Sequence, residues 1–187
     1  MPEEEYWETL LDVPLVLDAL GIDSRLRDVA EFGCGFGTFS IPIAQRISGN
    51  LLAFDIDPRM IARTRERAMG SGVTNVVLRE CDVMASGFGL PDASVDAVLL
   101  FNILHGEFPE TLLRHASRVV RTGGQVLIIH WRHDPRTPRG PDLSIRPRPE
   151  QVLAWAQATG ELRAAEAVTE LPPWHYGLKL LRLGESA

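Results

Sequence analysis

The most constraining feature of this sequence is a glycine-rich turn between an apolar segment and a helical one. The stretch 28–43 reads DVAEFGCGFGTFSIPI, and its three glycines occupy alternate positions, Gly33, Gly35 and Gly37. Glycine lets the backbone approach a ligand closely, and a helix that follows such a turn directs free N–H groups at that ligand. A strand, a glycine turn and a helix in this order predict the nucleotide-binding unit of an open α/β sheet.

Acidic residues follow the next two apolar segments, as a nucleotide site requires. Asp55 lies 18 residues after Gly37, and Asp82 ends the next expected strand. A carboxylate at a strand end accepts both hydroxyls of a ribose, and Asp82 offers an acceptor to an adenine amino group. Two alternatives stay open: Asp55 caps the helix that starts at Pro58, for which Asp57 is better placed, or Asp82 is an ordinary turn aspartate.

Helical and apolar segments alternate along the chain and predict one α/β domain over residues 1–187. Helices are expected over 3–20 (interrupted at Pro14), 38–47, 58–68, 109–120 and 150–158. Strands are expected over 28–32, 51–54, 75–82, 94–105, 125–131, 162–170 and 178–183, with a loop over 83–94. This order predicts a doubly wound, Rossmann-like, mostly parallel sheet with helices on both faces. The short turn before the last strand favours an antiparallel pair there.

Residues 132–150 interrupt this alternation with five prolines and five arginines. A loop of this length inside a compact domain is usually functional. We therefore expect a lid or substrate wall, whose arginines meet an anionic substrate; the alternative is a solvated loop. At the other end of the chain, residues 1–20 are expected to form a helical cap; the family resemblance given below implies that its Tyr6 and Trp7 fold over the cofactor.

Composition and charge limit the possible functions. The net charge is −6, which disfavours a nucleic-acid-binding surface. No apolar run approaches 18 residues, so no membrane span is expected, and the acidic start MPEEEYW is unlike a secretory leader. The two cysteines, Cys34 and Cys81, form no CxxC pair, so neither a disulfide framework nor a structural zinc site is expected. These features favour a cytoplasmic protein.

Taken together, the motifs resemble class I S-adenosylmethionine-dependent methyltransferases, in particular the small type 11, ubiquinone/menaquinone-methyltransferase-like subgroup. The matching features are ExGxGxG from Glu31 to Gly37, the acids Asp55, Asp57 and Asp82, and the terminal hairpin. The segment HWRHDPRTPRGP is a weaker match. The resemblance implies a seven-stranded sheet in the order 3-2-1-4-5-7-6 with the last strand antiparallel. It also implies S-adenosylmethionine as cofactor and transfer of its methyl group to a small molecule.

The resemblance assigns cofactor contacts to particular residues. Glu31 borders the methionine pocket, and the three glycines pass under the methionine and the ribose. Asp55, or else Asp57, takes the ribose hydroxyls, and Asp82 takes the adenine amino group. The expected cofactor-binding set is completed by Phe32, Cys34, Ile56, Cys81, Val83, Phe101 and Asn102.

The glycine spacing also distinguishes between cofactors. A dinucleotide fingerprint is G-x-G-x-x-G/A, and counting from Gly33 its third small residue falls on Thr38. The Glu31 carboxylate suits the cationic amino acid end of a sulfonium donor better than a diphosphate. Two alternatives stay open: an NAD(P)-binding oxidoreductase, and a non-catalytic S-adenosylmethionine-binding protein.

Histidines supply the candidate bases. His105 follows the fourth strand, His130 and His133 bracket the end of the fifth, and His175 precedes the last. Open α/β sheets bind ligands at that edge. We expect His105 and His133 to be catalytic if the acceptor arrives protonated; the alternative for each is a residue making one hydrogen bond. No metal site is expected, because no C-x-x-C or H-E-x-x-H pattern occurs. The acceptor atom and the oligomeric state stay open.

Overall fold

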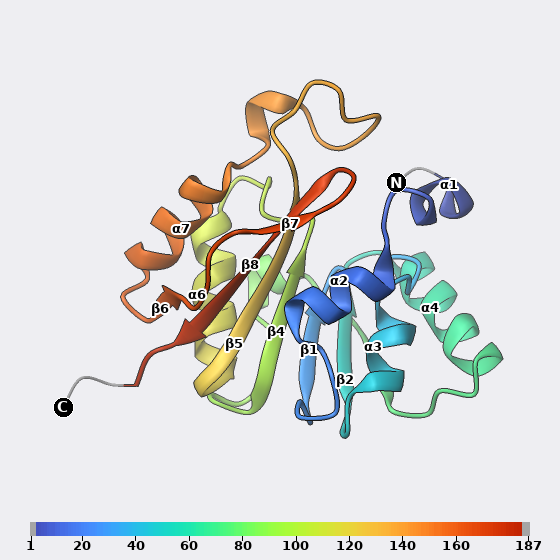
Figure 1. The fold of residues 1–187 in the computed structure, drawn as a ribbon. Coiled ribbons are helices and arrows are strands. Elements are labelled where there is room, and N and C mark those ends of the chain that lie inside the picture. Colours follow the sequence, from blue (N-terminus) through green and yellow to red (C-terminus); the bar gives the residue numbers. More distant parts are fainter. Residues whose placement is uncertain (1–2, 185–187) are drawn as a thin grey trace.

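An eight-stranded β-sheet with helices on both faces forms the centre of the molecule (Figure 1). The computed structural model describes residues 3–184. The strands are β1 (Val29–Phe32), β2 (Leu51–Asp55), β3 (Val76–Glu80), β4 (Val95–Phe101), β5 (Val120–Trp131), β6 (Leu162–Ala164), β7 (Thr169–Leu171) and β8 (His175–Arg182). The helices are α1 (Glu4–Glu8), α2 (Val13–Leu20), α3 (Ser40–Arg46), α4 (Pro58–Gly70), α5 (Val83–Ser86), α6 (Pro109–Val119), the 3-10 helix η1 (Leu143–Ile145) and α7 (Pro149–Ala158).

The strand order is β3-β2-β1-β4-β5-β8-β6, and β7 also pairs with β8. Strands β1 to β5 run parallel, whereas β8 is antiparallel to β5, β6 and β7. The predicted doubly wound α/β sheet, its order and its antiparallel last strand are confirmed. Because β1 lies between β2 and β4, the glycine turn starts in the middle of the carboxyl edge, where ligands bind in open sheets.

The predicted strand 162–170 is two short strands, which explains the eighth member of the sheet. Ala164 pairs with Leu180 and Thr169 pairs with Gly177, so four residues (165–168) lie opposite two residues of β8. The excess forms a bulge that divides the edge strand, a common arrangement at sheet edges.

Two strand boundaries differ from the prediction. β4 ends at Phe101 rather than at His105, because Asn102 adopts a left-handed φ of 57° and turns the chain. β5 starts at Val120 rather than at residue 125, since a register shift between Val95 and Ala97 accommodates the Gly123–Gly124 step within the ladder. A Cβ at Gly124 would come within 2.7 Å of the Asp96 carbonyl oxygen, so this bulge requires glycine.

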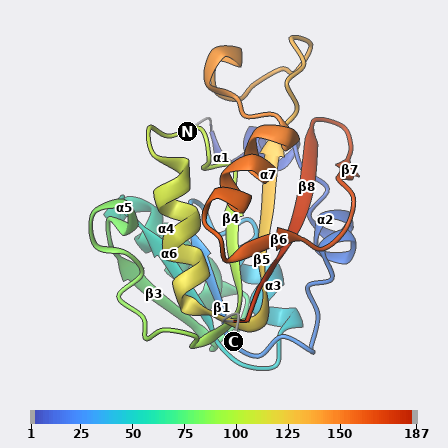
Figure 2. The same ribbon diagram turned by 90° about the vertical axis from the view of Figure 1, so that its left-hand side faces the viewer.

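Helices cover both faces of the sheet (Figure 2), and a separate hydrophobic cluster packs on each face. Successive residues of β4 alternate between them: Leu99 packs with α2 and α3, and Leu100 packs with α6 and α7. All seven residues of β4 are buried, as a nearly continuous apolar strand covered on both faces should be. Each fully buried leucine stabilises the fold by about 1.5–3 kcal/mol. The rigid centre therefore holds the carboxyl edge in place.

Local capping explains where several helices start. Asp12 accepts the N–H of Leu15 and Pro14 occupies the first turn of α2, so the predicted interruption separates α1 from α2. Asp82 caps α5, a one-turn helix inside the segment that was predicted to be a loop. The described helices include none that is both long and apolar enough to cross a bilayer.

The arginine- and proline-rich segment projects beyond the carboxyl edge of the sheet, at the top of Figure 1. Its residues 132–148, called the arginine loop below, are ordered around the buried side chain of Arg146. That guanidinium donates to the carbonyl oxygens of Arg132 (2.9 Å) and Pro141 (2.7 Å) and to the hydroxyl of Thr137 (2.5 Å). Its carbon Cζ lies 5.9 Å from the ring centroid of Trp131, on β5.

Candidate active site

The glycine turn has a backbone that only glycine adopts without strain. Gly33 and Gly37 have φ values of 77° and 79°. A Cβ at Gly37 would come within 3.0 Å of the Thr64 side chain, and one at Gly33 within 3.2 Å of Ile103. The N–H of Gly33 donates to the carbonyl oxygen of Phe54, which ties the turn to β2. The turn is thus held close to both neighbouring strands.

A cavity of about 160 Å³ opens beside this turn, among the carboxyl ends of β1, β2 and β4. Seven predicted cofactor residues line this donor cavity, namely Glu31, Gly33, Cys34, Gly35, Asp55, Phe101 and Asn102. It is completed by Trp7, Phe36, Thr38, Phe39 and Ile103. The structure therefore gathers residues from β1, β2, β4 and the N-terminal segment at one place.

Polar atoms without partners face this region. Within the described part of the chain, the amide oxygen and nitrogen of Asn102 and the hydroxyl of Thr38 are buried and lack a hydrogen bond. Each such atom costs about 1–3 kcal/mol. Asn102 also carries the left-handed backbone described above. Unsatisfied polar groups and strain that coincide at one cavity are typical of a ligand site.

Glu31 is the most strongly perturbed acid of the cavity. Its side chain is buried, and the hydroxyl of Ser40 donates to Oε2 at 2.5 Å. Burial, reinforced by the nearby Asp55 charge, raises the pKa of Glu31 to about 8, although the Ser40 hydrogen bond lowers it. The ligand-free protein therefore holds a neutral carboxyl here at pH 7, and a cation bound beside it would favour the carboxylate.

The structure separates the two candidate ribose acids. Asp55 is buried against the cavity and accepts the N–H of Gly35 and the N–H of Asp57, each at 2.9 Å. Asp57 instead caps α4 by accepting the N–H of Arg59 at 2.9 Å, and it pairs with the Arg59 guanidinium. The capping role considered for Asp55 belongs to Asp57.

Asp82, the predicted adenine contact, lies outside the donor cavity, as do Phe32, Ile56, Cys81 and Val83 of the predicted cofactor-binding set. Asp82 is exposed, and its Oδ1 accepts the N–H of Met84 (2.9 Å) and of Ala85 (3.1 Å). Ile56 is 63% exposed, whereas Val83 is a core residue. Cys81 is half-buried, with Sγ 3.3 Å from the Ser86 hydroxyl. Phe32 lines a separate apolar pocket with Ile103 and Met84.

A larger chamber adjoins the donor cavity. Its volume is about 560 Å³, and it shares Trp7 and Asn102 with the donor cavity. His105, Trp131 and Arg139 form further parts of its wall. We call it the acceptor chamber. A ligand there would lie directly across Trp7 and Asn102 from a ligand in the donor cavity.

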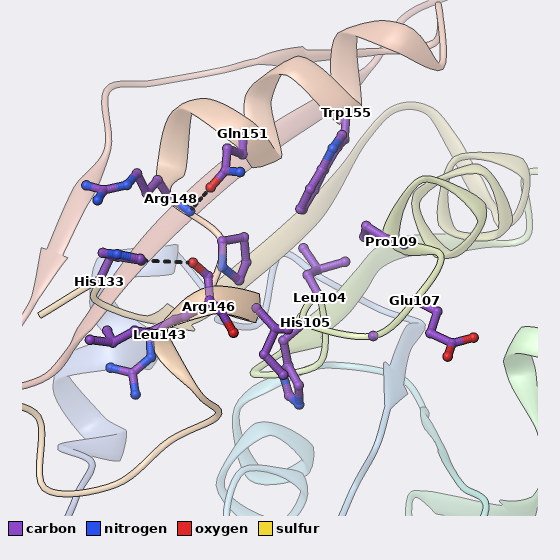
Figure 3. Close-up of a pocket in the computed structure, with 14 residues that line it drawn as sticks. Leu104, His105, Glu107, Pro109, His133, Leu143, Arg146, Arg148, Gln151 and Trp155 are labelled. Carbon is purple, nitrogen blue, oxygen red and sulfur yellow. Dashed lines mark hydrogen bonds between the residues drawn. The ribbon is translucent and has the colours of Figure 1, made fainter. Parts of the chain in front are cut away.

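A polar side pocket of about 400 Å³ opens on the other side of His105 (Figure 3). His105 enters it from the turn between β4 and α6, and His133 from the arginine loop. The Nδ1 atom of His133 lies 3.2 Å from the carbonyl oxygen of Arg146. The structure thus brings both predicted catalytic histidines to one pocket, and His105 alone of the two also lines the acceptor chamber.

Comparison with known proteins identifies the family. A model of the methyltransferase domain matches residues 29–124, about half of the chain. The chain belongs to the methyltransferase domain family. The match contains the glycine turn, Asp55, Asp82 and His105, and it ends before His130 and the arginine loop.

Relatives with known descriptions agree with this. The chain is 28% identical, over 88% of its length, to a probable S-adenosylmethionine-dependent methyltransferase of Mycolicibacterium smegmatis, but spans only 60% of that protein. It is 28% identical, over 74% of its length, to the ubiquinone biosynthesis O-methyltransferase of Pseudomonas fluorescens, and spans 68% of it. The structure of an Aquifex aeolicus SAM-dependent methyltransferase aligns with a TM-score of 0.84 at 22% identity, covering 97% of this chain and 94% of that one, which shows the fold.

The predicted methyltransferase family is therefore confirmed, and relatives of the chain are named as S-adenosylmethionine-dependent enzymes. The comparisons give no support to an NAD(P)-binding oxidoreductase. The methyltransferase domain supplies the donor side of the site. The acceptor chamber is lined largely by residues outside the matched span.

The five arginines of the arginine loop have different partners. Arg132 pairs with Glu170, and Arg136 pairs with Asp134 at 2.7 Å. Arg139, Arg146 and Arg148 have no acidic partner within residues 3–184: Arg139 lies 5.7 Å from the Tyr6 ring centroid, Arg146 holds the loop, and Arg148 lines the side pocket. Of the five arginines expected to meet an anionic substrate, three therefore remain candidates: Arg139, Arg146 and Arg148.

Sequence patterns did not reveal the roles of two residues, Thr38 and His130. Thr38 was considered only as a position of the dinucleotide fingerprint, yet its hydroxyl is one of the unpartnered buried atoms. His130 is fully buried and faces His105, a contact across strands that no sequence spacing reveals. Among the described residues, no cluster of three or more His, Cys, Asp or Glu side chains could hold a metal ion.

Proposed function

We propose that this chain transfers a methyl group from S-adenosylmethionine to a small-molecule acceptor. The observation that carries the proposal is the donor cavity: unpartnered polar atoms of Asn102 and Thr38 lie beside the acids Glu31 and Asp55 around a strained glycine turn. A ligand with a cationic amino group, a carboxylate and a ribose diol has partners for each of these groups.

Each residue has a defined task in this proposal. Glu31 becomes a carboxylate beside the cationic amino group, and Asp55 accepts hydrogen bonds from the ribose hydroxyls. The Asn102 amide and the Thr38 hydroxyl supply donors and acceptors to the amino acid end. When bound, S-adenosylmethionine supplies an electrophilic methyl group on a positively charged sulfur. We also keep Asp82 as the proposed contact of the adenine amino group at the open end of the site.

The acceptor occupies the chamber beside Trp7, Trp131 and His105. The chamber and the side pocket, at about 560 and 400 Å³, have the size of small-ligand sites. The arginine loop forms one wall, through Arg139 and Gly140, and acts as a lid over this chamber. His105 and His133 are the candidate bases. The acid-lined cavity and the net charge of −6 favour a small molecule over a nucleic acid.

Isothermal titration calorimetry with S-adenosylmethionine, S-adenosylhomocysteine and NADH tests the donor site. We expect both adenosyl compounds to bind and NADH not to bind. Asp55→Ala should weaken donor binding at least tenfold, because a charged hydrogen bond contributes about 1.5–3 kcal/mol. The matched control Asp57→Ala should reduce stability but leave donor affinity nearly unchanged. Tight NADH binding, or an unchanged affinity in Asp55→Ala, would overturn the assignment.

A methyl-release screen over phenols, quinols, thiols and amines tests the transfer itself. Formation of S-adenosylhomocysteine that depends on an added acceptor distinguishes an enzyme from a protein that only binds the donor. The expected result is turnover with at least one class that is lost in Asp55→Ala. Donor binding without turnover over the whole screen favours the non-catalytic alternative.

We further propose a reducing, cytoplasmic location. The two cysteines are unpaired in the structure, with Cys34 buried in the donor cavity, where burial raises its pKa and keeps the thiol protonated. Neither thiol has a disulfide partner among the described residues, as is usual for proteins of a reducing compartment. Fractionation of cells that express the protein tests this location.

A further inference from the structure

We propose that His130 is a positioning residue that holds His105 in the tautomer with an unprotonated Nε2 toward the acceptor chamber, so that the site methylates acceptors that release a proton from oxygen. This inference rests on the proposed methyl transfer and identifies its acceptor class. His130 has no role in the donor cavity and lies outside the matched family domain.

The contact between the two imidazoles is the starting point. Nδ1 of His105 lies 3.4 Å from Nε2 of His130, and the ring centroids are 5.5 Å apart at 73°. On its other side, Nδ1 of His130 lies 3.4 Å from the carbonyl oxygen of Trp131. The three groups form a chain that leads from the backbone of β5 to the wall of the acceptor chamber.

The positions of the protons follow from this chain. A carbonyl oxygen only accepts, so Nδ1 of His130 carries a hydrogen. Burial, and the neighbouring His105, His175 and Arg146, lower the pKa of His130 to about 3, so that its ring stays neutral and Nε2 is an acceptor. Therefore His105 donates from Nδ1, and when neutral it has a free lone pair on Nε2.

Packing around His130 prevents the ring from turning over. His130 is fully buried, and the Tyr176 ring on β8 lies tilted against it at 6.2 Å. The Tyr176 hydroxyl donates to the carbonyl oxygen of Pro147 at 2.9 Å, which joins β8 to the arginine loop. A ring held on these sides keeps its hydrogen-bond direction, as partners of metal-bound histidines do.

The charges around His105 favour a hydroxyl acceptor over an ammonium. Burial and the Arg146 charge lower the pKa of His105, so the ring is neutral and ready to accept a proton at pH 7. Arg139 lines this chamber and the Arg146 charge acts on His105, whereas no carboxylate of the described residues lines the chamber. Glu107, in the side pocket, is exposed. A cationic amine would meet no counter-charge here, whereas the arginine charges would stabilise the oxyanion that forms as a phenol or enol passes its proton to His105.

The proposed methyl transfer moves one methyl group to the acceptor and one proton to His105. The acceptor oxygen forms a bond to the methyl carbon, the carbon–sulfur bond breaks with its electron pair left on sulfur, and the O–H proton moves to Nε2 of His105. The imidazolium still donates from Nδ1 to His130, so the pair needs no rearrangement. The proton then leaves to water through the open side pocket.

Nitrogen-15 NMR of the imidazoles tests the tautomer directly, without any acceptor. In the wild-type protein, His105 should carry its proton on Nδ1 at neutral pH. In His130→Phe, which keeps a ring against Tyr176 but removes the acceptor, His105 should revert to the Nε2–H form that is usual in water. His130→Gln, whose amide oxygen can still accept, is the matched control and should retain the Nδ1–H form. An Nε2–H His105 in the wild type, or the same tautomer in wild type and His130→Phe, overturns the proposal.

Turnover distinguishes this inference from the proposed function. In the methyl-release screen, hydroxyl compounds should be methylated, and kcat should fall about 10- to 100-fold in His130→Phe with donor affinity unchanged. The acidic limb of the pH profile should move in that variant and be restored in His130→Gln. Transfer to amines alone would overturn the acceptor class while the methyltransferase assignment stands; loss of donor binding would instead overturn the assignment itself.

Discussion

At the scale of single residues, Glu31 is buried in the donor cavity, where its charged form is disfavoured. Glu31 has a pKa near 8 in the folded protein, against an ordinary value of 4.5. The folded state therefore binds a proton more tightly than the unfolded state between these values. Stability contributed by the neutral carboxyl is present below about pH 4.5 and is lost as the pH rises through about 8. Function and stability oppose each other at this position.

Glu31→Gln should separate the two effects. The amide keeps the Ser40 contact but cannot ionise, so the ligand-free variant should be more stable than the wild type at pH 8.5 by roughly 1–4 kcal/mol, at about 1.4 kcal/mol per pKa unit. Donor binding should be lost, because the cationic amino group has no carboxylate. Urea denaturation at pH 6 and pH 8.5 measures the difference; equal pH dependence in variant and wild type would contradict the burial argument.

Donor affinity should itself depend on pH. Since the free protein holds Glu31 protonated and the bound state needs the carboxylate, binding releases a proton below about pH 8. The dissociation constant should rise by about tenfold for each pH unit below that value. Calorimetry in buffers of different ionisation enthalpy counts the proton. Glu31→Asp, with a shorter carboxylate, should bind more weakly but retain the proton release.

At the scale of elements, α1 has no fully buried residue and is placed by ion pairs and by the packing of Trp7 against Trp131. The residues of this five-residue helix are exposed or half-buried, and a helix so short is unstable alone. Glu4 pairs with Arg63 (2.8 Å) and Arg67 (3.0 Å) on α4, and Glu8 pairs with Arg67 (2.5 Å). These contacts help to hold Trp7 at the wall of the donor cavity, as the proposed cap over the cofactor requires.

Arg67→Ala should loosen α1 and weaken donor binding about two- to fivefold, since exposed ion pairs contribute about 0.2–1 kcal/mol each. High salt should weaken donor binding to the wild type by a similar factor and should have less effect on the variant. Arg65→Ala, on the same helix and exposed, is the matched control and should behave like the wild type. Identical behaviour of the two variants would show that α1 does not contribute.

The methyl group that Gly140→Ala adds should be enough to detach the arginine loop from the sheet. A Cβ at Gly140 would lie 2.9 Å from both the Trp131 ring and the Arg146 guanidinium, at a φ of 116°. Gly140→Ala should therefore increase protease cleavage within 132–148 and reduce turnover, with little effect on donor affinity. Gly160→Ala has a φ of 74° but open space, so it controls for backbone strain alone. S-adenosylhomocysteine should protect the loop in the wild type if it closes over the donor.

At the scale of the whole molecule, a ligand that binds the donor cavity should stabilise the entire fold against unfolding. A donor that binds the folded state at about 100 times its Kd should add about 2.7 kcal/mol. For a domain of this size the midpoint of thermal unfolding should then rise by about 5–10 °C, whereas NADH should leave it unchanged. A larger shift with NADH than with the donor would contradict the cofactor assignment.

Sequence patterns predicted most strands and helices and the acids near the ends of strands β1 to β3 because these features are local: apolar runs mark strands, and polar residues follow strand ends. They placed Asp57 as the helix cap for the same reason. The order of the strands in the sheet is not local, and it was expected only from the resemblance to methyltransferases. The patterns failed where distant contacts decide the outcome. Asn102 ends β4 through its backbone conformation, β6 and β7 are separated by a bulge against β8, and His130 meets His105 only because β4 and β5 are neighbours.

The hydrogen bonds of Arg146 determine how the arginine loop, which forms a wall of the acceptor chamber, should open and fold. Its hydrogen-bond acceptors lie within residues 132–141, so the loop is largely a self-contained unit fastened to the sheet at Trp131 and Tyr176. Such a unit can unfold locally while β4 and β5 stay intact. Its amides should exchange with deuterium through small openings that denaturant hardly accelerates, whereas those of β4 exchange only on global unfolding. We therefore expect the arginine loop, which forms a wall of the acceptor chamber, to fold last, after the donor cavity has formed.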